Sequence, residues 1–208
     1  MQARVLRIKG SRDKVDRGAE HFVQNIAPRV KQLDGYSGLR LLVNRDTGDA
    51  MVVGFWRDAE TLRSSWEAMS SVRGDAFAEF GASAPEPEHF EAAVQHRPRP
   101  TEVGNAVRIS TLQGDPAKVD DGIRHFETQV IPEFERIDGF RGAILLVNRD
   151  SGAAIGATVW DSKDHLERSA SAATGIRERA AQVMGASGAQ AEAYEVHFAE
   201  LPTPVGAS

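Results

Sequence analysis

The sequence repeats itself once, at a constant offset of 104 residues and without a gap. The offset matches His21-Phe22 with His125-Phe126 and Asp34-Gly35 with Asp138-Gly139. A period of about one hundred residues is far too long for a solenoid repeat, so each copy is a building block of domain size. Between the copies, alternating prolines favour an extended spacer. The expected organisation is a first repeat over 1–94, a linker over 95–104, a second repeat over 105–199 and a loose tail over 200–208.

Composition limits the class of protein and its partners. Hydrophobic residues make up 41% of the chain and charged residues 26%, which is sufficient for a globular core. The net charge of -5 argues against a nucleic-acid partner, because such a partner needs clustered Lys and Arg. Cysteine is absent, which excludes disulfides and thiolate chemistry. No long apolar run or secretory h-region is found, so we expect no membrane partner and a cytoplasmic location.

Each repeat has the pattern of a βαββαβ unit. In the first copy, residues 3–9 predict a strand, and apolar residues at helical spacing then predict a helix that ends at Gly35 and is kinked by Pro28. Residues 36–44 and 50–56 flank a turn composition and predict a hairpin. A second helix is expected from Asp58, or from Asp161 in the second copy, followed by a last strand.

The βαββαβ order is the ferredoxin-like split motif, whose helices cover one face of the sheet. The hairpin strands are nevertheless apolar on both faces, with Leu41 and Val43 on one side and Leu42 on the other. Such a sheet needs cover on both sides. The predicted fold class is therefore α+β, with two ferredoxin-like repeats packed sheet to sheet as a pseudo-dimeric α+β barrel.

Four segments of the second repeat carry a resemblance to a known family. They are Ile131-Pro132-Glu133-Phe134, Asp138 to Gly142, the hairpin Leu145 to Gly152, and Val159-Trp160-Asp161-Ser162. With these segments the chain resembles the antibiotic biosynthesis monooxygenase-like (ABM) family of the dimeric α+β barrel superfamily, once in each repeat. The resemblance implies a pocket between sheet and helices. It also implies oxygenation of phenols or anthrone-like polyketides by dioxygen without a cofactor, or, in other members, haem binding or degradation.

Arg73 and Arg177 are the candidate catalytic residues. Both lie within the apolar stripe of the second helix, where an unpaired guanidinium is costly to bury. One interpretation is structural, a buried ion pair or a side chain that extends to solvent. The other is functional, stabilisation of a substrate phenolate or oxyanion.

Three tryptophans are candidates for stacking on an aromatic ligand, although each is also a plausible core residue. Trp56 and Trp160 end the third strand of their repeats, and Trp66 lies on the second helix of the first copy only, where the second copy has Ala170. This difference, together with Met69 against Ala173, predicts a narrower first pocket and a roomier second one.

Further substrate-binding candidates are His21 and His125, and Arg4 and Arg108. The histidines lie off the apolar stripe, at the surface or its boundary, but are suited to a general base if tertiary contacts enclose them. The arginines on the first strand either line a cavity or pair with Glu91 and Glu195.

The leading hypothesis is a cofactor-independent monooxygenase acting on a hydrophobic aromatic or polyketide-like small molecule. The alternatives are a non-catalytic ligand-binding or stress-associated protein and a haem-binding or haem-degrading protein, so whether the chain is an enzyme stays open. The six histidines show no metal-ligand spacing and the glycines no nucleotide-binding pattern, so no metal and no cofactor are expected. Further association of the fused pair into a homo-oligomer also stays open.

Overall fold

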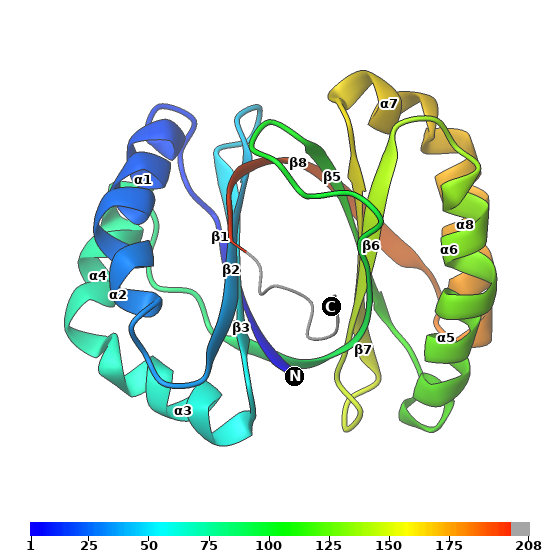
Figure 1. Cartoon of the computed structure of the whole chain (residues 1–208), viewed down its shortest axis with the longest axis horizontal. Coiled ribbons are helices and arrows are strands. Elements are labelled where there is room, and N and C mark those ends of the chain that lie inside the picture. Colours follow the sequence, from blue (N-terminus) through cyan, green and yellow to red (C-terminus); the bar gives the residue numbers. More distant parts are fainter. Residues whose placement is uncertain (201–208) are drawn as a thin grey trace, which may run out of the picture. The chain divides into compact units, whose positions relative to one another are not determined.

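The computed structural model describes residues 1–200, and the predicted tail from residue 201 onward lies outside the described residues. The first repeat follows the expected βαββαβ order, with each helical layer made of short segments (Figure 1). Its elements are β1 (Gln2–Ile8), α1 (Val15–His21), a π-helical turn (Phe22–Ile26), α2 (Ala27–Val30), β2 (Tyr36–Asn44), β3 (Asp49–Trp56), α3 (Ala59–Ala68), α4 (Ser70–Glu79) and β4 (Glu88–His96).

The second repeat has the same order of elements. Its first helix is preceded by a 3-10 turn (Pro116–Lys118), where the Asp115 carboxylate accepts a hydrogen bond from the Ala117 amide. The elements are β5 (Ala106–Gln113), α5 (Val119–His125), a π-helical turn (Phe126–Val130), α6 (Ile131–Glu135), β6 (Phe140–Val147), β7 (Ala153–Trp160), α7 (Lys163–Arg168), α8 (Ala170–Val183) and β8 (Ala189–Glu200).

The strands pair antiparallel around two hairpins. Strand β3 pairs with β1 and β2, and β7 pairs with β5 and β6. The hydrogen-bonded order is β1-β3-β2-β8-β5-β7-β6-β4, which is a closed barrel. The predicted fold class is confirmed: the protein is α+β, with an eight-stranded antiparallel barrel built from two ferredoxin-like halves.

The chain divides into two compact units whose boundaries cross the repeats. One unit comprises residues 1–89 together with the end of β8 from Val196, and the other comprises residues 90–195. Strand β4 therefore pairs within the second unit, with Val94 opposite Leu145 of β6. In the first unit, Lys31 forms an ion pair with Glu200, and its ammonium lies 5.2 Å from the Phe198 ring centre. Each unit thus contains a strand segment from the other repeat.

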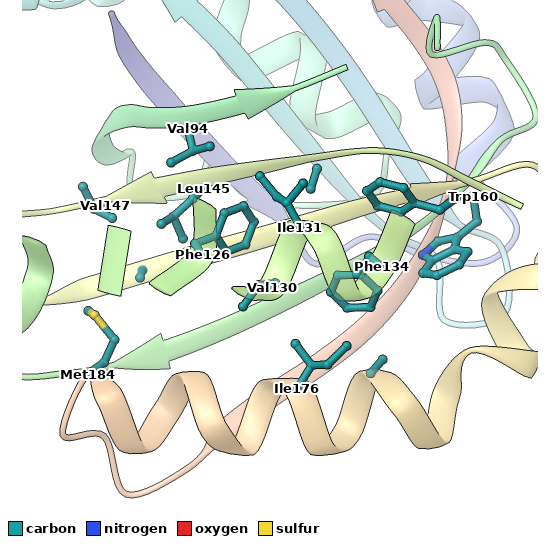
Figure 2. Close-up of a cluster of buried hydrophobic side chains, with 14 of the residues drawn as sticks. Val94, Phe126, Val130, Ile131, Phe134, Leu145, Val147, Trp160, Ile176 and Met184 are labelled. Atoms are coloured by element: carbon teal, nitrogen blue, oxygen red, sulfur yellow. The ribbon is translucent and has the colours of Figure 1, made fainter. Parts of the chain in front are cut away.

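The core of the second unit lies between its sheet and the helices on one sheet face (Figure 1). Figure 2 shows Ile176 and Met184 pointing from α8 towards the sheet, with Phe134 near Trp160. The centre of the Trp160 ring lies 5.8 Å from that of Phe134 and 5.7 Å from that of Phe140, both edge to face. In the first unit, the corresponding layer contains Val15, Ala19, Phe22, Ile26, Met69, Ala76, Phe77 and Phe80.

Two details of the helices differ from the prediction. The expected kink at Pro28 is replaced by a π-helical turn directly before it, in which the Ala27 amide bonds to the Phe22 carbonyl. A proline cannot donate its own helical hydrogen bond, so the helix widens at a point where one bond is lost in any case. The second helix is broken in both copies, at Met69 and at Ser169, and in the second copy it is capped by Ser162 rather than starting from Asp161.

Among residues 1–200, every helix falls short of the length and apolarity that a membrane crossing would require.

Candidate functional site

Each unit contains a cavity of about 70 Å³ between its sheet and its helices. A single water needs roughly 10–15 Å³ in this measure, so each cavity has room for several waters or for a small aromatic ring system. The first cavity is lined by Arg4, Leu6, Ile8, Phe22, Ile26, Val30, Leu39, Val52, Gly54, Trp56, Ser65, Trp66, Met69, Val72, Arg73, Ala76, Phe77 and Phe80.

Two arginines and a tryptophan form the polar end of the first cavity. The guanidinium carbon of Arg73 lies 3.7 Å from the centre of the Trp66 ring and that of Arg4 lies 4.9 Å from it, so the indole interacts with both cations. Arg4 also donates to the Ser65 hydroxyl at 3.0 Å and to the Leu62 carbonyl, while Arg73 donates to the Trp66 carbonyl.

Among residues 1–200, no carboxylate lines this cavity. Burial, together with the nearby Arg73 charge, lowers the pKa of Arg4 to about 10. Two cations without an acidic partner in a poorly solvated space favour an anionic or acceptor-rich ligand, because such a ligand would offset both desolvation and mutual repulsion. The sequence left two interpretations of Arg73, structural and functional. The side chain is half-buried and bonded to the helix backbone, and it also lines the cavity, so its position is compatible with both.

Trp56 supplies a hydrogen-bond donor that is not used. Its side chain lines the first cavity and is only 2% exposed, and its indole Nε1 has no partner among the described residues. The Nε of Arg4 is likewise buried and unpartnered. An unsatisfied buried donor typically costs about 1–3 kcal/mol, so two in one cavity are unusual in a native fold.

The second cavity is built from the equivalent elements but is more polar. Arg108 donates to the Ser169 hydroxyl at 2.8 Å and to the Leu166 carbonyl at 2.6 Å, and Arg177 donates to the Thr174 hydroxyl at 3.2 Å. Burial and the Arg177 charge lower the pKa of Arg108. Its lining residues are Arg108, Ser110, Leu112, Gly122, His125, Phe126, Val130, Phe134, Leu145, Val147, Ala154, Gly156, Thr158, Ala173, Ile176, Arg177, Ala180 and Met184.

In the part of the chain that the structure describes, His125 is the only histidine lining either cavity. Burial and the charge of Arg179 lower its pKa, and Glu133 opposes that shift. The imidazole is therefore neutral at physiological pH and able to accept a proton. His21, its counterpart, is half-buried outside the first cavity, with its Nδ1 3.4 Å from the Asn25 side-chain amide.

Trp160 differs from Trp56 in both position and bonding. It is fully buried at 0% exposure, lies outside the lining of the second cavity, and donates from Nε1 to the Thr158 hydroxyl at 3.0 Å. The first copy has Gly54 in place of Thr158, so Trp56 lacks this internal acceptor. Sequence reasoning did not identify Gly54, Thr158 or Ser110, although aligning the two copies reveals the Gly54 and Thr158 difference.

The structure bears on two further expectations, the positions of Arg4 and Arg108 and the relative sizes of the two cavities. Arg4 and Arg108 line the cavities and bond to the helices, while Glu91 is bound by Arg149, with Nε and Oε2 2.6 Å apart. The expected difference in size is wrong, because both cavities have the same volume. Ala170 and Ala173 are smaller than Trp66 and Met69, but the second copy also has the larger Phe134 and Thr158 in place of Val30 and Gly54.

Two proteins of Mycobacterium tuberculosis, Rv2557 and Rv2558, are each 30% identical to this chain, over 202 and 203 residues. The matches cover 97% of this chain and 90% and 86% of theirs. The chain belongs to their family. Both relatives are uncharacterized, so membership of the Rv2557/Rv2558 family brings no activity with it. No family model matches the chain.

Solved structures relate the Rv2557/Rv2558 family to the ABM-like proteins by fold. An anthrone oxidase-like protein superposes with a TM-score of 0.68 at 15% identity, covering 100% of this chain and 96% of its own. A Listeria monocytogenes ferredoxin-fold protein related to antibiotic biosynthesis monooxygenases gives 0.53 at 10% identity, with 94% of each chain covered. The predicted resemblance is thus confirmed for the fold, and identities this low show the fold alone.

The haem-degrading enzyme LmHde of Listeria monocytogenes also shares the fold, with a TM-score of 0.53 at 9% identity over 94% of this chain and 99% of its own. The haem alternative drawn from the sequence expects a histidine of the second helix, facing the cavity, as the axial ligand. Helices α3, α4 and α8 have none, and His165 of α7 lies outside the second cavity with its Nδ1 3.0 Å from the Ser162 hydroxyl. Within residues 1–200, no three metal-binding side chains gather.

Proposed function

We propose that this protein is a cofactor-independent monooxygenase acting on a planar phenolic or anthrone-like small molecule, and that the second cavity is the reacting site. The observation that carries the proposal is the combination of Arg108, Arg177 and a neutral His125 in one apolar cavity without a carboxylate. The fold likeness to ABM-like proteins supports the same reaction class by analogy.

His125 is assigned the role of general base. Because its pKa is lowered, the ring is unprotonated at neutral pH and takes the acidic proton of the bound substrate. Arg108 and Arg177 stabilise the resulting anion, and their effect is large because the apolar walls keep the local dielectric low. Deprotonation makes the substrate electron-rich enough to react with dioxygen.

The reaction balances without an external reductant. For a substrate with a methylene between aromatic rings, the anion R₂CH⁻ adds O₂ to give R₂CH–OO⁻, which takes a proton back from protonated His125. The hydroperoxide then loses its remaining C–H proton as the O–O bond breaks, giving R₂C=O and water. The net reaction is R₂CH₂ + O₂ → R₂C=O + H₂O, and all four electrons come from the substrate.

The test follows oxygen uptake and product formation with anthrone and with 1-naphthol. His125→Ala is expected to lower kcat/KM by about a hundredfold or more, as for loss of a general base, and Arg177→Ala by a similar factor. His21→Ala, the same change at the matching position outside a cavity, is expected to leave the rate within about twofold.

Three other outcomes would support a different site or a different function. A rate abolished by Arg73→Ala but kept by Arg177→Ala would move the reaction to the first cavity. Absence of uptake with every phenolic substrate would favour a non-catalytic binding protein. A Soret shift on haem titration would favour a haem protein.

A further inference from the structure

The difference between Gly54 and Thr158 leaves a built but incomplete hydrogen-bond site in the first cavity. In the second unit, the Thr158 hydroxyl accepts the indole proton of Trp160 at 3.0 Å. In the first unit, the equivalent indole Nε1 of Trp56 lies 3.4 Å from where a Cβ on Gly54 would stand, with no acceptor provided among the described residues. The missing side chain at Gly54 therefore leaves a notch on this face of the sheet, next to the unused Nε1 donor of Trp56.

The strand register adds a second unused donor beside the same notch. Arg4 of β1 is paired directly with Gly54 of β3, so their side-chain positions share one face of the sheet. The Arg4 Nε is buried and unpartnered. An acceptor seated over Gly54 would therefore be approached by Nε of Arg4 and Nε1 of Trp56, both of which line the cavity.

The charge of the cavity indicates what kind of acceptor fits. Arg4 and Arg73 both contribute positive charge, and the described lining residues include no Asp or Glu. His21 does not reach the cavity, so a phenol entering it would meet no base to take its proton. A carboxylate carries its charge at neutral pH without a base, and it only accepts hydrogen bonds. The remaining walls are apolar and include Trp66 and Phe77, which suit a planar ring.

We propose that the first cavity is a second, non-equivalent ligand site that binds a small aromatic carboxylate, with its carboxylate over Gly54 and hydrogen-bonded by Trp56 Nε1 and Arg4 Nε. The site does not depend on oxygenation in the second cavity. The two copies differ at this point, because the second copy has the internal acceptor Thr158 and the first copy has Gly54 in its place.

The test uses the three indole N–H signals of the chain, from Trp56, Trp66 and Trp160, in ¹H–¹⁵N correlation spectra of the full chain under nitrogen. Benzoate and 2-naphthoate are the probes, and 2-naphthamide is the neutral control of the same shape. The Trp56 signal is expected to move downfield on adding a carboxylate, while the Trp160 signal stays in place and the amide binds at least tenfold more weakly.

Matched variants locate the site. Gly54→Thr supplies the hydroxyl that the second copy already has, and its Cβ has ordinary van der Waals room, so the chain should fold while carboxylate affinity, measured by calorimetry, falls at least tenfold. Thr158→Gly alters the other unit and should retain the affinity. The proposal is overturned if neither probe binds at millimolar concentration, if the Trp56 signal does not move on binding, or if Gly54→Thr binds as tightly as the natural chain.

Discussion

At the scale of single residues, the two halves differ most in how they satisfy one buried indole. Trp160 and Thr158 form a closed pair within the second unit, whereas Trp56 faces Gly54 with its donor unused. A buried hydrogen bond adds modestly to stability, but removing one partner and leaving the other unpaired costs much more. The Thr158 hydroxyl is therefore more important for stability than its size suggests.

Thr158→Val should expose this cost directly. Valine keeps the shape and the β-branched character that suits a strand, but leaves the Trp160 donor unsatisfied, so we expect a loss of about 1–3 kcal/mol in the free energy of unfolding. Urea denaturation at unchanged m-value measures it. Thr158→Ser keeps the acceptor and should lose less. Equal losses in the two variants would mean that the hydrogen bond is not the cause.

The lowered pKa of His125 predicts where the acid limb of activity lies. His125 stops acting as a base only when the pH falls below its pKa in the folded protein, which lies below 6.5. Oxygen uptake should therefore persist at pH 6.5 and decline at lower pH. Arg179→Ala removes the cation that lowers this pKa and leaves Glu133, which raises it, so the limb should move to higher pH. An NMR titration of the His125 ring checks this without turnover, and an unchanged or lowered pKa in that variant would contradict the electrostatic argument.

The sequence predicted some of these residues and could not predict others. An arginine within an apolar stripe is visible as an anomaly, so Arg73 and Arg177 could be selected. His21 and His125 have the same local pattern, yet only the second lines a cavity. The two charges that act on the pKa of His125, Glu133 and Arg179, are Arg29 and Asp75 in the first copy. The notch at Gly54 depends on strand register and rotamer, which no periodicity encodes.

At the scale of elements, two guanidinium groups bond to the backbone of α3, one of them next to the break in the second helix. Arg4 of β1 donates to the Leu62 carbonyl in the middle of α3, and Arg73 of α4 donates to the Trp66 carbonyl in its last turn. The last carbonyls of a helix need partners from outside the regular helical pattern, and Arg73 supplies one of them here. The apolar spacing that predicted one continuous helix contains no sign of these bonds, whereas the strands and hairpins, defined by local alternation and turn residues, were predictable.

Helix α1 contains a glycine notch that receives the end of α4. A Cβ on Gly18 would stand 2.5 Å from Cγ of the Phe80 ring, which is fully buried. Gly18→Ala should therefore overpack the core and lower the free energy of unfolding by about 1–3 kcal/mol, measured by urea denaturation.

Gly74→Ala is the matched control for this notch. Gly74 is exposed on α4 and a Cβ there meets nothing within 4 Å, so alanine should stabilise by about 0.5–1 kcal/mol through helix propensity alone. If Gly18→Ala were also neutral or stabilising, Phe80 would have to be free to shift, and the close packing of α1 and α4 would be refuted.

At the scale of the whole molecule, the repeats of the sequence and the compact units of the fold are different divisions of the chain. The repeat boundary is seen in self-alignment, but the unit boundary at residue 90 depends on which strand β4 pairs with. Sequence alone favours pairing within a repeat, because nearby segments meet most often. In the structure, β4 pairs with β6 of the other repeat, whereas β8 pairs with β5 of its own repeat before its last residues join the first unit.

This arrangement predicts how the chain behaves when it is cut between its repeats. A fragment of residues 105–208 lacks β4, so the edge of β6 from Ala143 to Val147 loses its partner and exposes an apolar strand. A fragment of residues 1–104 retains β4 without β6. Neither fragment alone should be a stable monomer by size exclusion and circular dichroism, and the two co-expressed should purify together because β4 can return to β6. If the two fragments instead fold as separate monomers and do not associate, the pairing of β4 with β6 contributes little to stability and each repeat is a self-sufficient domain.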